Sequence, residues 1–159
     1  MTRFALLPWV CCALVLAGVS PGSAEAQPLT PDEHGFIVAT PGDMVPAEGS
    51  RSVRVLGASG EPGMYVTRIT FAAGTGTKPH SHDQGRYITV LEGTWWVALG
   101  PEASTYQPET MRPVTAGSFI YEPPHGIHYD QARDDAVTVQ ITGVGPVKTM
   151  TPSAPTRTP

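Results

Sequence analysis

The chain has 159 residues, of which 40% are hydrophobic and 15% are charged, and its formal net charge is −4 at pH 7. This length suits one domain with a sizeable core. The sequence has no basic patch and no lysine run, which argues against nucleic acid and acidic membrane surfaces as partners.

The first 26 residues have the pattern of a secretory signal peptide. Arg3 supplies a positive charge, residues 4–19 are almost wholly apolar, and Ala24-Glu25-Ala26 is a small-x-small cleavage site. The apolar run is too short for a membrane anchor. We therefore expect a periplasmic or secreted protein that does not contact the membrane after cleavage. Cys11 and Cys12 leave with the signal peptide, so the mature chain can form no disulfide.

Residues 27–50 are rich in Pro, Gly and acidic residues, and we expect them to form an arm that adds at most one strand. From Arg51 the pattern changes to short β-forming runs broken by Gly and Pro, without a sustained helical period. The expected strands are Ser52–Leu56, Met64–Phe71, Arg86–Leu91, Thr94–Leu99, Ser118–Tyr121 and Ala136–Thr142. Many short strands at close intervals predict an all-β sandwich or barrel over residues 51–147. Residues 148–159, which are rich in Thr and Pro, are expected to be a disordered tail.

Four of the five histidines lie in two clusters. His80 and His82 are two residues apart, and in an extended strand this spacing places both imidazoles on the same face. Such a pair forms half of a metal site. His125 and His128 form the second cluster and could supply the other half from another strand. The alternative is that the first pair is solvated in a loop.

The two clusters resemble the two sequence motifs of the cupins. The first cupin motif, G-x5-H-x-H-x3-4-E-x6-G, is matched at Gly74, His80, His82 and Gly93, and the second, G-x5-P-x-G-x2-H-x3-N, is matched at Gly117, Pro123 and His128. The resemblance implies a small single-domain cupin of the metal-binding type 2 kind, with a jelly-roll barrel, also called a double-stranded β-helix. It also implies three histidine ligands. It specifies the fold more closely than the activity, because this family hosts many chemistries on one barrel.

Arg86 stands where the first motif has its glutamate, His125 where the second has a glycine, and Ala132 where the second has its asparagine. A guanidinium has no lone pair to donate, so Arg86 cannot replace the glutamate as a ligand. We expect an anionic exogenous ligand to bind the metal and Arg86 together. Three-histidine cupins without the glutamate ligand exist in the family, among them iron dioxygenases. The alternative is an outward-facing Arg86 paired with Asp83 or Glu92.

Other side chains near the motifs could complete the site. The candidates that offer an oxygen or nitrogen donor are Asp83, Gln84, Tyr87, Glu122 and His125. We predict Gln84 as the further metal ligand beside the three histidines. We predict Arg86 as an anchor for the substrate, and Tyr87 or His125 as the group that transfers a proton.

The sequence leaves two classes of function open. Three imidazoles suit one divalent transition metal, namely Fe, Zn, Mn, Ni or Cu. The first hypothesis is a metal-dependent enzyme, such as an oxidoreductase of the dioxygenase type, an isomerase or a lyase, that acts on a small anionic or enolisable molecule. The second is a non-catalytic cupin that binds a metal or a small ligand. A homodimer formed by arm exchange or sheet packing is a further expectation.

Overall fold

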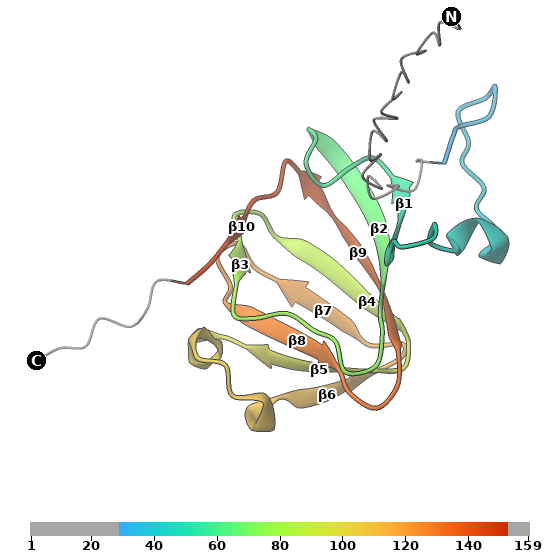
Figure 1. Ribbon diagram of the computed structural model, residues 1–159. Helices are drawn as coiled ribbons and strands as arrows, with labels where there is room; N and C mark the ends of the chain where they lie inside the picture. The colour runs from blue at the N-terminus through green and yellow to red at the C-terminus, as the bar shows by residue number, and fades with distance from the viewer. Residues whose placement is uncertain (1–28, 153–159) are drawn as a thin grey trace, which may run out of the picture.

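The structure is a computed structural model, and it describes residues 29–152. Figure 1 shows a β-barrel formed by curved antiparallel sheets, and the helical elements within residues 29–152 are short 3-10 turns. The larger sheet has the order β1-β2-β9-β4-β7, and the smaller one has the order β6-β5-β8. The fold is therefore the predicted all-β jelly roll.

The strands of the larger sheet are β1 (Ser52–Leu56), β2 (Gly63–Phe71), β4 (Arg86–Glu92), β7 (Phe119–Glu122) and β9 (Val137–Gly145). Those of the smaller sheet are β5 (Thr94–Leu99), β6 (Arg112–Thr115) and β8 (His128–Ala132). A third pair consists of β3 (Ser81–His82) and β10 (Thr149–Met150). The six predicted strands are confirmed, and the four that were not predicted are β3, β6, β8 and β10.

The hydrophobic core lies between the two larger sheets, because alternate residues of each strand point inward. Ile88 and Val90 of β4 and Val137 and Val139 of β9 are fully buried. Their partner across the core is Trp95 of β5, which is 2% exposed. Burial of this apolar surface is the main favourable contribution to the stability of the barrel.

Neighbouring tryptophans on β5 point to opposite faces, as the alternation of side chains along a strand requires. Trp95 packs against Phe71 inside the barrel, with the ring centroids 6.1 Å apart. Trp96 is half-buried, and the Arg133 guanidinium carbon lies 3.7 Å from its ring centroid. The cation covers the face of the outer indole.

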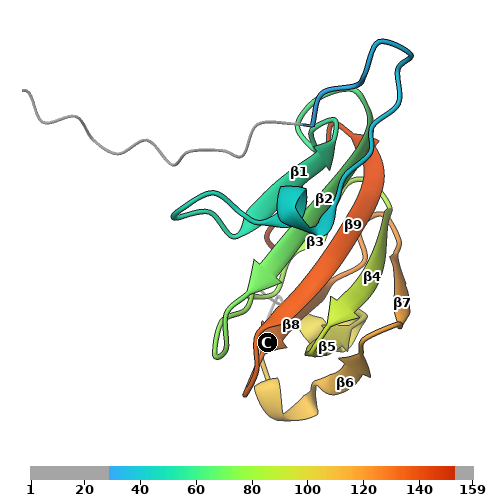
Figure 2. The ribbon, with the colours of Figure 1, turned by 90° about the vertical axis from the view of Figure 1, so that its right-hand side faces the viewer.

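The described part of the arm, residues 29–50, contains no strand and one short 3-10 turn, η1 (Pro41–Met44). Figure 2 shows η1 on the outer side of β1 and β2. Two further 3-10 turns, η2 (Pro101–Ser104) and η3 (Pro108–Thr110), interrupt the loop between β5 and β6. The predicted signal peptide, with Cys11 and Cys12, lies outside the described residues.

The prediction of a disordered tail is wrong for its first residues. Thr149 and Met150 pair with His82 and Ser81 as antiparallel strand partners. The Lys148 backbone N–H also donates a hydrogen bond of 2.7 Å to the Asp83 carboxylate. These contacts involve backbone groups, which every residue type carries, so a composition poor in aliphatic residues did not prevent pairing. Residues 153–159 lie outside the described part.

No helix within residues 29–152 is long and apolar enough to cross a membrane.

Candidate metal centre

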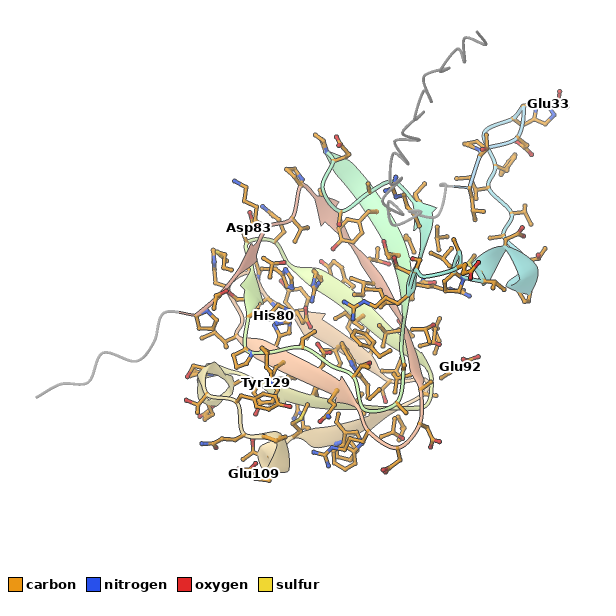
Figure 3. The ribbon with its side chains drawn as sticks, viewed as in Figure 1. Glu33, His80, Asp83, Glu92, Glu109 and Tyr129 are labelled. Carbon is orange, nitrogen blue, oxygen red and sulfur yellow. The ribbon has the colours of Figure 1, made fainter. Side chains whose placement is uncertain are left out.

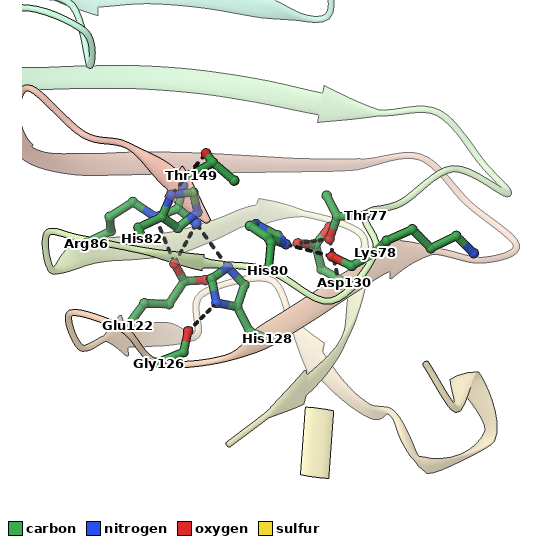
Figure 4. Close-up of polar contacts among 10 residues, drawn as sticks. All are labelled: Thr77, Lys78, His80, His82, Arg86, Glu122, Gly126, His128, Asp130 and Thr149. Carbon is green, nitrogen blue, oxygen red and sulfur yellow. Dashed lines mark hydrogen bonds and ion pairs between the residues drawn. The ribbon is translucent and has the colours of Figure 1, made fainter. Parts of the chain in front are cut away.

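Two segments of the barrel bring three histidines together, of which His80 is labelled in Figure 3 and all three are labelled in Figure 4. His82 lies on β3 and His128 begins β8, while His80 and His128 form a β-bridge in which each backbone N–H donates to the other's carbonyl at 2.9 Å. This bridge fixes the first histidine cluster against β8. One candidate ligand atom of each of the three side chains lies within 4.8 Å of the other two. The sequence prediction that His80, His82 and His128 converge is confirmed.

Backbone carbonyls fix which ring nitrogen carries the proton. His80 Nδ1 lies 2.8 Å from the Lys78 carbonyl oxygen, and His128 Nδ1 lies 2.9 Å from that of Gly126. A carbonyl oxygen only accepts hydrogen bonds, so each Nδ1 donates its proton and each Nε2 keeps its lone pair. Metal-binding histidines commonly have this arrangement, in which the second ring nitrogen is anchored to a neighbouring group.

His82 supplies the third candidate ligand nitrogen. Its Nδ1 lies 3.3 Å from the Thr149 hydroxyl oxygen of β10, and its Nε2 is buried without a hydrogen-bond partner among the described residues. A buried nitrogen without a partner costs free energy unless another group binds it. The three histidines therefore fit a divalent transition metal, which would bind the lone pairs that their Nε2 atoms present.

Burial keeps all three imidazoles neutral at pH 7. It lowers the pKa of His82 to about 3, and the positive charge of Arg86 acts in the same direction. Burial also lowers the pKa of His128 to about 4, against the opposing effect of the hydrogen bond to Gly126. The pKa of His80 is lowered as well, mainly by burial. Neutral imidazoles are the form that binds a metal, so protons compete little at this site.

Arg86 faces the interior and is paired with a carboxylate that sequence reasoning did not assign to it. Arg86 on β4 and Glu122 on β7 are direct cross-strand partners. The Arg86 Nε and Nη2 atoms donate to Glu122 Oε2 at 2.8 and 2.5 Å, and the two side chains are only 13% and 5% exposed (Figure 4). The alternative of an outward-facing Arg86 paired with Asp83 or Glu92 is wrong.

This ion pair touches the histidine cluster. Arg86 Nη2 lies 3.3 Å from His128 Nε2, and Glu122 Oε1 lies 3.4 Å from the same nitrogen. Burial raises the pKa of Glu122, whereas the charge and the hydrogen bonds of Arg86 lower it. Because the guanidinium is already neutralised by Glu122, it is not the free anion anchor that the sequence analysis expected.

The structure does not bring the other predicted site residues into the cluster. Tyr87 follows Arg86 on β4, so its side chain lies on the outer face, where it is 52% exposed and its ring centroid is 5.3 Å from that of Tyr121. Gln84 is exposed in the turn after β3. The predicted ligand role of Gln84 and the predicted catalytic role of Tyr87 therefore find no support in this geometry.

His125 has the positive φ that its glycine position suggested, with a value of 62°. Its side chain is exposed, and its contribution to the site is a backbone N–H that donates to the His82 carbonyl at 2.7 Å. This bond ties the loop before β8 to β3. The predicted proton-transfer role of the His125 side chain finds no support in this geometry.

Sequence reasoning missed Asp130. It lies two residues after His128 on β8, so it shares the inward face, and it is 5% exposed. Its Oδ2 accepts a hydrogen bond of 2.9 Å from the Thr77 hydroxyl, while Oδ1 has no partner of good geometry among the described residues. Burial raises the pKa of Asp130 to about 6, although the bond from Thr77 acts in the opposite direction. The spacing from His128 was the signal that could have identified it.

A cavity of about 480 Å³ opens beside the histidines. His80, His82, Arg86 and Asp130 line it, together with apolar side chains that include Ile69, Phe71 and Ile141. Arg51 and Lys78 also line it, and both are exposed. This volume is in the range of small-molecule sites. The cavity thus combines a potential metal site, apolar walls and two exposed cations.

Comparison with solved structures supports the fold. The chain is similar to a cupin 2 domain-containing protein from Halorhodospira halophila, with 17% identity, a TM-score of 0.54, and coverage of 79% of this chain and 80% of that one. It is less similar to the DMSP lyase DddQ from Ruegeria pomeroyi DSS-3, with 14% identity, a TM-score of 0.48, and coverage of 59% and 46%. The chain is also similar to KdgF from Halomonas sp., with 18% identity, a TM-score of 0.45, and coverage of 59% of this chain and 77% of that one.

The chain thus spans less than half of the length of DddQ. No curated protein is similar enough in sequence to count as a match. Residues 39–148, however, match the model of the ChrR cupin-like domain. This match covers more than half of the chain and includes both histidine clusters. The chain therefore belongs to the ChrR cupin-like family of the cupins.

Proposed function

We propose that this protein is a periplasmic metal-dependent enzyme that acts on a small anionic or enolisable molecule. The observation that carries the proposal is the set of three neutral histidines, each with a candidate ligand nitrogen within 4.8 Å of the other two, beside a cavity of about 480 Å³. Three protein ligands leave coordination positions for a substrate, which distinguishes catalytic from closed structural metal sites. One divalent ion, namely Fe, Zn, Mn, Ni or Cu, would supply Lewis-acid chemistry or, for a redox-active metal, oxygen activation.

Cations near the cavity would favour the binding of a negatively charged ligand. Arg51 and Lys78 line the cavity and are exposed, and Lys78 Nζ lies 3.6 Å from the ring centroid of Tyr106. Arg86 contributes little net charge, because Glu122 neutralises it. An anion would therefore be attracted by Arg51 and Lys78 and would then meet the apolar surface of Ile69 and Phe71, which excludes water.

Asp130 is the group that we propose to transfer a proton. It lies on the same face of β8 as His128, and it lines the cavity. The Thr77 hydroxyl holds its Oδ2, which leaves Oδ1 to accept a proton from a bound molecule. Removal of a proton next to a carbonyl is the step that enolisable substrates require. Asp130 replaces Tyr87 and His125 in this role, because their side chains are exposed.

A non-catalytic binding protein is the second candidate. The observation that favours it is the contact between Arg86 Nη2 and His128 Nε2 at 3.3 Å, in which the guanidinium N–H occupies the lone pair that a metal would bind. Competition for this lone pair weakens metal binding and would suit reversible capture rather than a permanently loaded enzyme.

Metal analysis and turnover assays separate the two candidates. Protein purified from the periplasm of its own host should contain about one transition metal ion per chain if three histidines form the site. Oxygen uptake and the ultraviolet absorbance of the enol are then followed with a panel of small 2-oxo acids, which are both anionic and enolisable. Turnover that is lost in Asp130→Asn but not in the exposed variant Gln84→Ala would support the enzyme. Metal occupancy without turnover of any panel member would favour the binding protein.

The location is tested separately. Mature protein recovered from the periplasm should begin at Gln27, as shown by N-terminal sequencing. An uncleaved chain in the cytoplasm would refute the proposed export.

A further inference from the structure

The inner face of the larger sheet becomes polar at its β1 edge. Phe71 of β2 is buried in the core, and alternate residues of a strand share one face, so Thr67 and Ile69 point to the same side as Phe71. Their direct partners on β1 are Arg54 and Ser52. Figures 1 and 2 show β1 at one end of the barrel and β5, β6 and β8 toward the other end. The polar part of this face therefore extends beyond the core.

A cavity of about 450 Å³ covers this polar face, and we call it the β1 groove. Arg51, Ser52, Thr67 and Ile69 are among the residues that line it. Arg51 and Ile69 also line the cavity of about 480 Å³ beside the histidines. A third cavity, of about 130 Å³, is lined by Thr67, Ile69 and His82 among others. Because Ile69 borders all three, the cavities adjoin and lead from the histidines to β1.

The charged and hydroxyl groups of the β1 groove suit an anion. Its charged residues are Arg51, Arg54 and the exposed Glu61, so positive charge is in excess. The Arg51 guanidinium carbon lies 5.0 Å from the ring centroid of Phe71, and this contact holds the cation where the groove meets the histidine cavity. The planar guanidinium can donate two parallel N–H bonds to one carboxylate, and the Ser52 hydroxyl offers a further donor.

We propose that the protein binds an elongated dicarboxylate, with one carboxylate at the histidine centre and the other in the β1 groove, where Arg51 holds it. This inference rests on the proposed function, because it places the reacting end of the molecule at the histidines. The carbon chain between the two carboxylates lies along Ile69, the apolar residue that borders all three cavities. Two anionic ends also account for the two exposed cations, since Lys78 lines the histidine cavity and Arg51 lines both it and the groove.

Isothermal titration calorimetry of the Zn²⁺-loaded protein tests the proposal. The probes are succinate, adipate and suberate, and each is compared with the monocarboxylate of equal length, namely butyrate, hexanoate and octanoate. The gain is the ratio of the two affinities at one length. A hydrogen-bonded ion pair with Arg51 should give a gain of about 10-fold or more for adipate or suberate, and a smaller gain for succinate, which is the shortest. Equal affinities within every pair would overturn the proposal.

Two variants locate the second carboxylate. Arg51→Gln removes the charge where the groove meets the histidine cavity, and it should abolish the gain. Ser52→Leu fills the β1 groove without changing any charge, and it should abolish the gain as well. Ser52 contributes backbone groups to its hydrogen bonds with Ser50, so this substitution should leave the fold intact, which a thermal melt checks. A gain that survives in either folded variant would overturn the proposal.

Lys78→Gln is the matched control, because Lys78 lines the histidine cavity but not the β1 groove. It should weaken the binding of both members of a pair and leave the gain unchanged, whereas a gain lost in this variant too would reduce the role of Arg51 to a general effect of charge. His82→Ala tests the proposed function separately. It should abolish octanoate binding, and an unchanged octanoate affinity would refute the histidine centre, while the gain continues to report on the β1 groove.

Discussion

Replacing Asp130 by asparagine should remove a pH-dependent loss of stability in the metal-free protein. The pKa of this carboxyl is raised from 3.8 to about 6 by burial, so the folded protein holds the proton more tightly than the unfolded chain. The contribution of Asp130 to the free energy of unfolding is therefore fully present below pH 3.8 and is lost as the pH rises through about 6. An asparagine has no proton to lose in this range, and it can still accept the hydrogen bond that Thr77 donates to Asp130 Oδ2.

The size of the effect follows from the shift. A shift from 3.8 to about 6 corresponds to about 3 kcal/mol in full. Between about pH 4.5 and about pH 7.5, roughly 2 kcal/mol of this is expressed, because the unfolded carboxyl is already partly ionised at the lower pH. Relative to the wild type, Asp130→Asn should therefore gain roughly 2 kcal/mol over this interval.

Urea unfolding of both proteins at the two pH values, in the presence of a chelator, measures this difference. Subtracting the unfolding free energy of the wild type from that of the variant cancels the titration of the other groups. Thr77→Val is the matched control, because it removes the hydrogen bond that lowers the pKa of Asp130 and should therefore steepen the loss of stability with pH. A difference between Asp130→Asn and the wild type that stays constant across the interval would refute a raised pKa at this position.

Three further variants test other contacts. Thr149→Val removes the hydroxyl beside His82 Nδ1. It should lower metal affinity about 10- to 100-fold in a chelator competition and leave the melting temperature nearly unchanged, whereas an unchanged affinity would contradict a supporting role for β10. Arg86→Glu places two buried carboxylates opposite each other, so it should lower the unfolding free energy measured by urea titration by about 3–5 kcal/mol. An unchanged unfolding free energy would show that the Arg86–Glu122 pair is not buried. Tyr121→Ser removes one of three neighbouring exposed aromatic rings on β4 and β7, the others being Tyr87 and Phe119. It should shift the predicted homodimer toward monomer in sedimentation equilibrium, whereas a monomeric wild type would refute the dimer.

The parts of the fold that the sequence predicted are those in which local pattern and tertiary environment agree. β4 and β9 carry alternating apolar residues because one face packs on the core, and both runs are recognisable without a structure. β8 was missed because its inward face carries His128 and Asp130 instead of aliphatic residues. A strand that lines a polar site loses the alternation by which strands are recognised.

The same distinction applies to the site. Ligand spacing within one strand is a local property, so His80 and His82 were found, and the motif match added His128. The Arg86–Glu122 pair depends on the register between two strands, with the partners 36 residues apart, which no local pattern specifies. The placement of Tyr87 beside Arg86 in the site was avoidable, because adjacent residues of a strand cannot both face inward.

The pairing of β10 with β3 also determines when the centre can assemble as the chain folds. His82 and Thr149 are 67 residues apart, and the pairing of β2 with β9, which joins Gly63 to Gly145, spans a similar or longer separation. Contacts of such high sequence separation form late in folding, so the histidines come together only when the barrel itself closes. The metal ion would therefore bind a barrel whose strands are already paired and would not nucleate its folding, unlike the ion of a zinc finger. Chelation should accordingly empty the site without unfolding the protein.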